Sequence, residues 1–299
     1  MYDTTLAPRP AAAPSPGLLG AYAHLRRAEH LLVTDWEPLS GRDFVLRVRW
    51  PAPQEDLPYD PRVLAQTVRQ TGLVVAHGAF GVPLTHQTML STLAFTIDPG
   101  LRVPRGRTFE PVVHVGVAEG GGARRTGRAL RMSFRVLGEG REGRTLARAE
   151  SEFSWIPDRV YERLRGSRRT GAWADWPVPP PVDPRLVGRA RPVDVALAAG
   201  GRPHRWLLRN DPDNHLLFDH PVDHVPGLAL LEAADQAARA LRFPGRLAPA
   251  TVEAAYWRYV DFDRPCWITA EPLPEPGCVR VTGTQEGRRA FRVDFRTSC

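Results

Sequence analysis

The chain has 299 residues, 42% of them hydrophobic, which is enough apolar material for the core of one large domain or of two domains of ordinary size. All 40 basic residues are arginine, and with 30 prolines and 26 glycines this indicates a coding bias behind much of the formal net charge of +7. The arginines are not clustered in the manner of a recognition helix, so we expect no nucleic-acid partner. The composition also excludes a chain that is disordered throughout.

Neither a membrane span nor a metal site is expected. No uninterrupted apolar run approaches the roughly 20 residues that a bilayer-spanning helix needs. The start, MYDTTLAPRPAAAPSPG, lacks the apolar core of a signal peptide, so we expect a soluble cytoplasmic protein without membrane contact. Cys266, Cys278 and Cys299 form no CxxC pair and no metal-type spacing. We therefore expect reduced thiols, and neither a metal nor another cofactor.

Two stretches rich in proline divide the chain. Residues 1–22 are rich in Pro and Ala without periodicity, which predicts a disordered N-terminal arm. Residues 158–189 include the run WADWPVPPPVDP, and this predicts a Pro-rich linker that is neither a helix nor a central strand. The remaining blocks, 23–157 and 190–299, are predicted to be two repeats of one fold.

The first block reads as one helix among extended segments. The helix is predicted from Asp60 to about His77, because Asp60 can cap it, Pro61 suits its first turn, and Gly78 follows its end. The extended segments fall at residues 43–51, 85–98, 111–119, 128–138 and 145–157.

The second block repeats this order. A helix is predicted from Pro226 to Leu241, and its small residues would let a sheet approach it closely. The extended segments fall at residues 204–211, 250–262, 266–272, 277–285 and 289–297. When the two helices are aligned at an offset of 166, LAQTVRQT lies over LLEAADQA, so that Gln66 matches Glu232 and Gln70 matches Gln236. The match indicates an internal duplication.

The fold predicted from this order is α+β. The strands alternate apolar and polar residues, as strands with one wet face do, and each block offers a single helix to cover the other face. This is a tandem, or double, hotdog, with two antiparallel sheets each wrapped around a central α-helix. Two such halves can pair within one chain, so both a monomer with an internal pseudo-dimer and a homodimer remain open.

The sharpest chemical signal is the stretch NHLLFDHPVDHVPGLALLEAADQ, residues 214–236. It places His220 and His224 before a helix that starts at Gly227, and it places Glu232 inside that helix. The free amides of a helix start can polarise a thioester carbonyl, and a carboxylate among apolar neighbours is suited to proton transfer. The predicted catalytic residues are Glu232, His220, His224 and Gly227.

Other interpretations of this stretch remain open. A metal site can be drawn from His215, Asp219, His220, Asp223 and His224. Pro221 and Pro226 oppose it, because they prevent the regular helix that an HxxxH zinc pair needs. In a purely structural interpretation the histidines cap the helix and Glu232 bonds to nearby backbone. We favour a functional interpretation, because burying the carboxylate of Glu232 costs free energy.

The spacing PG-x4-E-x3-Q resembles the central helix of β-hydroxyacyl-carrier-protein dehydratases. The longer string FDHPVDHVPG is more similar to the A-factor biosynthesis hotdog family. LLVTDW at residues 31–36, DPRVLAQTVRQ at 60–70 and GVPLTHQ at 81–87 carry the same resemblance, which spans both blocks.

The resemblance implies an acyltransferase. It would move a β-ketoacyl chain from an acyl carrier protein thioester to a hydroxyl of dihydroxyacetone phosphate, in the biosynthesis of a γ-butyrolactone, butenolide or furan signalling molecule. Two positions depart from the family pattern: Gln66 stands where members tend to carry Glu, and Asp235 where they tend to carry Arg. Arg69 is then the candidate phosphate clamp. The predicted substrate-binding residues are Arg69, Gln66, Gln70, His86, Asp235 and Gln236.

Two other functions fit the same residues. One is dehydration, hydration or hydrolysis of an acyl thioester, which would need no acceptor. The other is a non-catalytic regulatory protein that binds an acyl ligand, and the departures at Gln66 and Asp235 agree with it. Replacement of Glu232 by Gln separates the classes, because a binding protein would keep its ligand affinity.

Overall fold

The computed structural model describes residues 15–53, 57–119, 128–139, 143–166 and 176–298. The first half forms α1 (Pro16–Tyr22), β1 (Val33–Ser40), β2 (Asp43–Val48), α2 (Pro61–Gly78), β3 (Gln87–Ile97), β4 (Pro111–Glu119), β5 (Arg128–Glu139), β6 (Thr145–Ile156) and α3 (Asp158–Arg165). The second half forms β7 (Leu197–Arg202), β8 (Arg205–Leu208), α4 (Gly227–Arg242), β9 (Pro249–Tyr256), β10 (Cys266–Pro272), β11 (Cys278–Gln285) and β12 (Arg288–Thr297).

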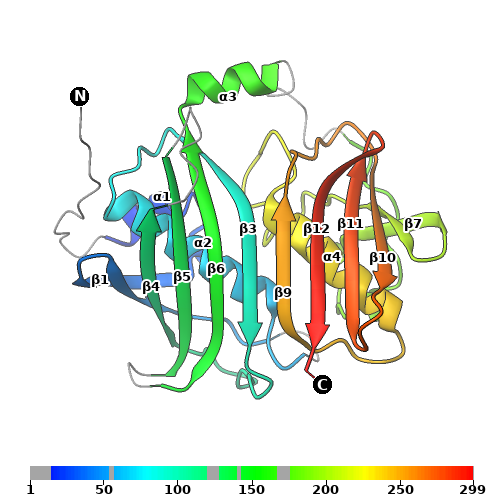
Figure 1. Ribbon diagram of the computed structural model, residues 1–299, viewed down its shortest axis with the longest axis horizontal. Helices are drawn as coiled ribbons and strands as arrows, with labels where there is room; N and C mark the ends of the chain where they lie inside the picture. Colours follow the sequence, from blue (N-terminus) through cyan, green and yellow to red (C-terminus); the bar gives the residue numbers. More distant parts are fainter. Residues whose placement is uncertain (1–14, 54–56, 120–127, 140–142, 167–175, 299) are drawn as a thin grey trace.

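The described strands form one antiparallel sheet, in the order β1-β2-β4-β5-β6-β3-β9-β12-β11-β10-β8-β7 (Figure 1). The tandem hotdog is confirmed, but the two expected sheets are continuous, because β3 pairs with β9. Outward from this junction, the order β3-β6-β5-β4-β2-β1 matches β9-β12-β11-β10-β8-β7 position by position. The two halves therefore share one topology, related about the β3–β9 junction.

Helices α2 and α4 cover the same face of the sheet and contact each other (Figure 1). Asp60 caps α2 through the amide of Arg62, and Pro61 occupies its first turn. Pro226 precedes α4 and supplies no side-chain cap. The alanines of α4 from Ala229 to Ala238 are buried, which lets the helix approach strands β10 and β11 closely. None of the helices in the described ranges is long and apolar enough to cross a membrane.

The glutamines matched by the alignment make the same contacts in the two halves. In α2, Gln70 donates to the carbonyl of His30 at 2.9 Å and accepts from the amide of Leu32 at 2.8 Å. In α4, Gln236 makes the equivalent pair of 2.8 Å bonds, to the carbonyl of Asp194 and from the amide of Ala196. Each glutamine fixes the segment that leads into its outermost strand. Both amides are thus occupied by backbone rather than directed at a substrate.

The predicted arm and linker contain more structure than expected. Within the predicted arm of residues 1–22, Ser15 caps α1 and Leu19 is buried, while residues 1–14 lie outside the described range. Within the predicted linker of residues 158–189, α3 follows directly after Pro157, which is compatible with a helix start. Farther along, Arg189 is fully buried, and residues 167–175 lie outside the described range. Proline content alone therefore did not indicate α1, α3 or the buried side chain of Arg189.

Candidate functional site between the central helices

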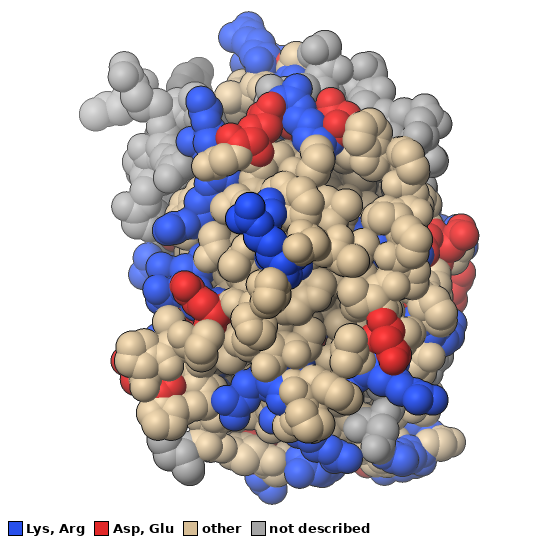
Figure 2. Space-filling view, turned by 90° about the vertical axis from the view of Figure 1, so that its right-hand side faces the viewer, with Lys and Arg blue, Asp and Glu red and all other residues tan. Residues whose placement is uncertain are grey.

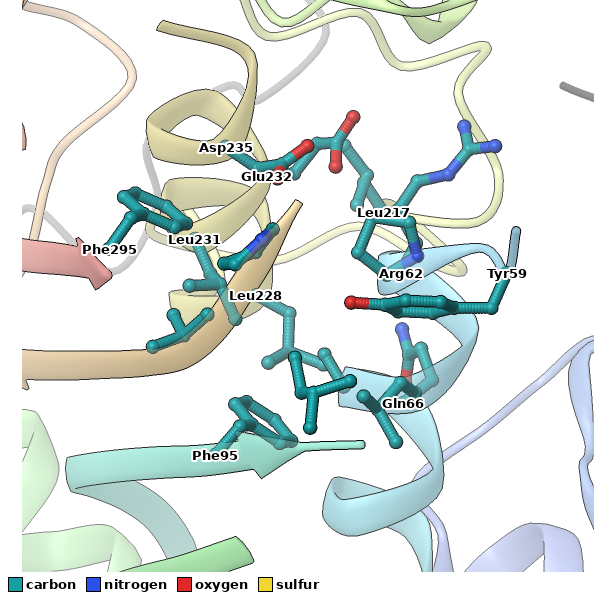
Figure 3. Close-up of a pocket in the computed structure, with 16 residues that line it drawn as sticks. Tyr59, Arg62, Gln66, Phe95, Leu217, Leu228, Leu231, Glu232, Asp235 and Phe295 are labelled. Carbon is teal, nitrogen blue, oxygen red and sulfur yellow. The ribbon is translucent and has the colours of Figure 1, made fainter. Parts of the chain in front are cut away.

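A narrow cavity of about 40 Å³ lies between α2 and α4, next to the β3–β9 junction (Figure 3). Its apolar wall consists of Pro61, Leu64, Ala65, Phe95, Ile97, Leu217, Leu228, Leu231, Pro249, Val252 and Phe295. The polar residues that reach it are Tyr59, Arg62, Gln66, Glu232 and Asp235. The cavity thus brings together three of the predicted site residues, Gln66, Glu232 and Asp235, from two different helices.

Glu232 is 3% exposed and is held by a guanidinium group. Arg189 donates from Nε to Oε1 and from Nη2 to Oε2, both at 2.7 Å, and Gln236 also donates to Oε1. A carboxylate has about four lone-pair positions, so one on Oε2 is left for a ligand. The bidentate pair fixes the direction of that position.

Asp235 continues the same ion-pair network. It accepts from Arg189 Nη2 at 3.0 Å and from Arg239 Nε at 2.7 Å. Burial opposes its charge, but the two arginines hold the pKa of Asp235 below its usual range. The negative charge of Asp235 is therefore balanced by Arg239 of the same helix together with Arg189, which comes from the predicted linker.

Tyr59 is the neutral donor of the cavity. Its ring enters between the helices and its hydroxyl points toward α4 (Figure 3). Burial and the charge of Asp235 raise the pKa of Tyr59 above its usual value, so the phenol stays protonated. Within the described residues its hydroxyl has no hydrogen-bond partner, which leaves this donor for a ligand.

Gln66 and Arg62 complete the polar lining. Gln66 donates from Nε2 to the carbonyl of Leu216 at 3.1 Å, whereas its Oε1 is buried with no hydrogen-bond partner among the described residues. Arg62 pairs with Asp60 at 2.7 Å and with Asp194 at 3.0 Å. Arg62 therefore ties the start of α2 to the second half, while Gln66 offers the cavity an unpaired acceptor.

His220 does not line the cavity. Its Nδ1 lies 3.1 Å from Asp219, whose carboxylate also accepts from the amides of Arg26 and Arg27. Asp219 thereby ties the loop before α4 to the segment after α1. The histidine and Glu232, which are near neighbours in sequence, contact different sets of side chains.

Arg69 belongs to the surroundings of His220 rather than to those of Glu232. Arg69 donates to the carbonyl of Ala23 at 3.1 Å, and burial lowers its pKa to about 10 against the attraction of Asp219. Beside it, His77 Nδ1 lies 2.7 Å from the carbonyl of Val82, to which it donates, and its Nε2 lies 2.8 Å from His24 Nε2. Several groups that can carry positive charge thus gather at the far end of α2.

This cluster predicts a fall in stability under mildly acidic conditions. Burial, with the neighbouring His77, Arg69 and His220, lowers the pKa of His24 from 6.5 to about 4. Between pH 6.5 and 4, His24 binds a proton in the unfolded chain but stays neutral in the folded protein. The free energy of unfolding is therefore highest above pH 6.5 and falls as the pH drops toward 4. We expect a loss of about 2 kcal/mol after allowance for solvent screening. Urea unfolding at pH 7, 5.5 and 4 checks it, and the H24Q variant should show a shallower pH dependence; equal dependence in both proteins would contradict the assignment.

His224 lies in a third environment, against α3. Its Nδ1 is 2.7 Å from Asp223 and 3.0 Å from the hydroxyl of Tyr161, and its ring packs edge-on against Tyr259. Arg165 pairs with the same aspartate at 3.2 Å. His224 is therefore held as part of the attachment of α3 to the second half.

Gly227 and His86 also lie outside the cavity lining. The carbonyl of Gly227 accepts from the hydroxyl of Tyr256 at 3.1 Å, and a Cβ on Gly227 would meet Leu90 at 3.6 Å, an ordinary contact. His86 is half-buried, with its Nδ1 unpaired among the described residues. In the described part of the chain, no group of three or more His, Cys, Asp or Glu is placed to hold a metal.

The sequence did not single out Arg189, Tyr59 or Arg62. Nothing in a single sequence separates Arg189 from the other 39 arginines, because its role depends on a contact with a helix 43 residues away. Tyr59 directly precedes Asp60, the predicted cap of the first helix. In the alignment of the two blocks, the segment that contains Tyr59 matches the loop before α4, and this match could have drawn attention to Tyr59.

The comparisons with known proteins agree with this architecture. Residues 12–157 and 173–268 match the model of the A-factor biosynthesis hotdog domain family. The 2-oxo-3-(phosphooxy)propyl 3-oxoalkanoate synthase of Streptomyces virginiae is 36% identical over 279 residues, covering 90% of this chain and 93% of that protein. The synthase of the same name from Streptomyces coelicolor is 33% identical and covers 91% of this chain and 88% of that protein.

Solved structures support the fold. The 12:0-ACP thioesterase from Umbellularia californica superposes with a TM-score of 0.53 at 14% identity, covering 87% of this chain and 98% of that one. An acyl-ACP thioesterase from Bacteroides thetaiotaomicron gives 0.50 at 15% identity, with 84% and 97% covered. With the family match across most of its length, the chain belongs to the A-factor biosynthesis hotdog family.

Proposed function

We propose that this protein is an acyltransferase that moves a β-ketoacyl group from an acyl carrier protein thioester to a hydroxyl of dihydroxyacetone phosphate. The observation that carries the proposal is the similarity, across nine-tenths of the chain, to synthases whose name describes the ester of these two components. The cavity between α2 and α4 supports it, because an apolar channel with a few convergent polar groups suits an acyl thioester.

The polar lining suggests a division of roles. Tyr59 would donate to the thioester carbonyl oxygen, on which negative charge develops in the transition state. Glu232 would take the proton of the acceptor hydroxyl through the remaining lone pair on Oε2, and Arg189 would hold it in position. The ester C–O bond forms as the C–S bond breaks, and the proton passes to the departing thiolate.

The channel is narrower than a fatty chain, so binding requires movement of its apolar wall. Leucine side chains of α2 and α4, Leu64, Leu228 and Leu231, separate the two helices at this point. A change of their rotamers would widen the space without disturbing the sheet. The length of acyl chain that the protein accepts would then depend on these three residues.

Removal of the Tyr59 hydroxyl tests its role. In Tyr59→Phe we expect kcat to fall about 100-fold, because one donor to the developing oxyanion is lost, while KM changes little. Tyr161→Phe is the matched control, since its hydroxyl bonds Asp223 outside the cavity. Steady-state kinetics of both variants give the answer, and equal kcat values in Tyr59→Phe and wild type would remove Tyr59 from the mechanism.

The proposed function itself is tested by its product. Purified protein is incubated with a β-ketoacyl thioester and dihydroxyacetone phosphate, and the mixture is analysed by mass spectrometry. We expect the phosphorylated β-keto ester, formed only when both substrates are present. Consumption of the thioester at the same rate without acceptor would instead indicate hydrolysis or dehydration, and the absence of ester from folded protein at several chain lengths would refute the proposal.

A further inference from the structure

A hollow of about 610 Å³ adjoins the cavity, at the end of the sheet where β3 ends and β9 begins. We call it the arginine groove. The loops after β3 and α4, the segment before α2 and the turn at residues 185–188 form its wall. Tyr59, Ile97 and Pro249 line both the groove and the cavity, so a ligand lying in the groove can extend into the space between the helices.

The charge of the groove is strongly one-sided. Its arginines are Arg102, Arg105, Arg185, Arg246 and Arg239, the last of which is paired with Asp235. Among the described residues that line it, Asp98 is the single carboxylate, and Asp98 is itself paired with Arg144. Figure 2 shows basic side chains at the same, lower end of the molecule, as well as along its left side and at its top. Such an excess of guanidinium groups favours a phosphorylated ligand.

The groove is also partly apolar and too large for a small ligand. Phe243 is 51% exposed and faces it together with Leu57, Leu186 and Val103. Its volume falls within the range of about 300–1,000 Å³ that is typical of pockets for drug-sized molecules. A three-carbon phosphate would leave most of this space and the apolar wall unused.

We propose that the arginine groove binds the phosphopantetheine arm of the acyl donor, with the phosphate against the guanidinium groups and the thioester end reaching past Tyr59 into the cavity. The identity of the donor rests on the proposed function. The phosphate of the acceptor shares the same chemistry, and the volume and the exposed Phe243 favour the longer arm.

Binding measurements test the groove without turnover. Isothermal titration calorimetry compares 4′-phosphopantetheine with pantetheine, which lacks the phosphate, on the full chain. We expect the phosphorylated compound to bind at least tenfold more tightly, and the double variant R185A/R246A to remove most of that difference. Arg102 is left in place because it bonds the carbonyls of Pro99 and Leu101 and so holds the groove wall.

The matched control is R131A/R202A, which removes two exposed arginines from strands β5 and β7, away from the groove. It should keep the full preference for the phosphorylated compound. Equal binding of the two compounds to wild type, or equal losses in the two double variants, would overturn the proposal. The proposal would also be wrong if R185A/R246A weakened the binding of dihydroxyacetone phosphate and the pantetheine portion contributed nothing to affinity. The groove would then belong to the acceptor.

The experiments distinguish an error in the proposal for the groove from an error in the proposed function. Wild-type protein is assayed for ester formation with an N-acetylcysteamine thioester, which carries no phosphate. If this donor gives the ester, but the binding of 4′-phosphopantetheine is the same in wild type and R185A/R246A, the proposal for the groove is wrong and the proposed acyltransferase activity stands. If no donor gives the ester, but R185A/R246A weakens the binding of 4′-phosphopantetheine, the proposed acyltransferase activity is wrong and the groove remains a phosphopantetheine site.

Discussion

Glu232→Gln should lower kcat/KM for acyl transfer by at least 100-fold. The substitution keeps the shape of the side chain but removes its capacity to take a proton, and general base catalysis contributes about 10² to 10⁴. Arg189 keeps Asp235 as a partner, so the variant should remain folded. Steady-state kinetics, with circular dichroism and thermal unfolding to establish the folded fraction, give the measurement.

Two further variants sharpen this test. Glu253→Gln changes an exposed carboxylate on β9 that pairs with Arg296, and it should keep wild-type kinetics. His220→Gln changes the histidine at the other end of α2, which does not line the cavity, so its effect should be smaller than that of Glu232→Gln. If His220→Gln abolishes transfer while Glu232→Gln keeps it, the reaction takes place beside Arg69 and not between the helices.

Arg189→Met should lower the free energy of unfolding by about 3–5 kcal/mol. The variant removes the guanidinium that bonds both Glu232 and Asp235. Asp235 keeps Arg239 as a partner, whereas the carboxylate of Glu232 is left buried without a counter-charge. Burial opposes the charge of Arg189, but these carboxylates raise its pKa above the ordinary value, so the charge persists in the fold. Urea denaturation at pH 7 measures the loss.

The neighbouring arginine provides the control for stability. Arg185→Ala removes an exposed side chain four residues earlier and should change stability by less than about 0.5 kcal/mol. Combining Arg189→Met with Glu232→Gln should recover part of the loss, because the uncompensated charge of Glu232 is removed. A loss below about 1 kcal/mol in Arg189→Met, or no coupling between the two substitutions, would show that the ion pair does not hold Glu232.

Regular periodicity made the central helices and most strands predictable, whereas the strands at the edges of the sheet were missed. The helices at residues 60–77 and 226–241 were found within one or two residues, because caps, prolines and apolar spacing agree there. Strands β1 and β7 were not singled out, since VTDWEPLS and LAAGGR lack β-branched alternation. They lie at the two edges of the sheet, where pairing on one side imposes fewer demands on sequence.

The site was only partly predictable, for a geometric reason. Short-range spacing correctly placed Gly227 and Glu232 on one helix, and the alignment correctly paired Gln70 with Gln236. Whether a loop residue such as His220 faces its own helix or the helix of the other half depends on tertiary packing, which one sequence does not contain. Buried Arg189 depends on the same long-range packing.

The central claim is that the acyl chain lies between α2 and α4, and a crystal structure with a non-hydrolysable β-ketoacyl phosphopantetheine analogue tests it most directly. We predict the chain between Leu64, Leu228 and Leu231, with the carbonyl beside Tyr59 and Glu232 and the phosphate in the arginine groove. An analogue bound against His220 and Arg69, with the space between the helices still closed, would contradict the account.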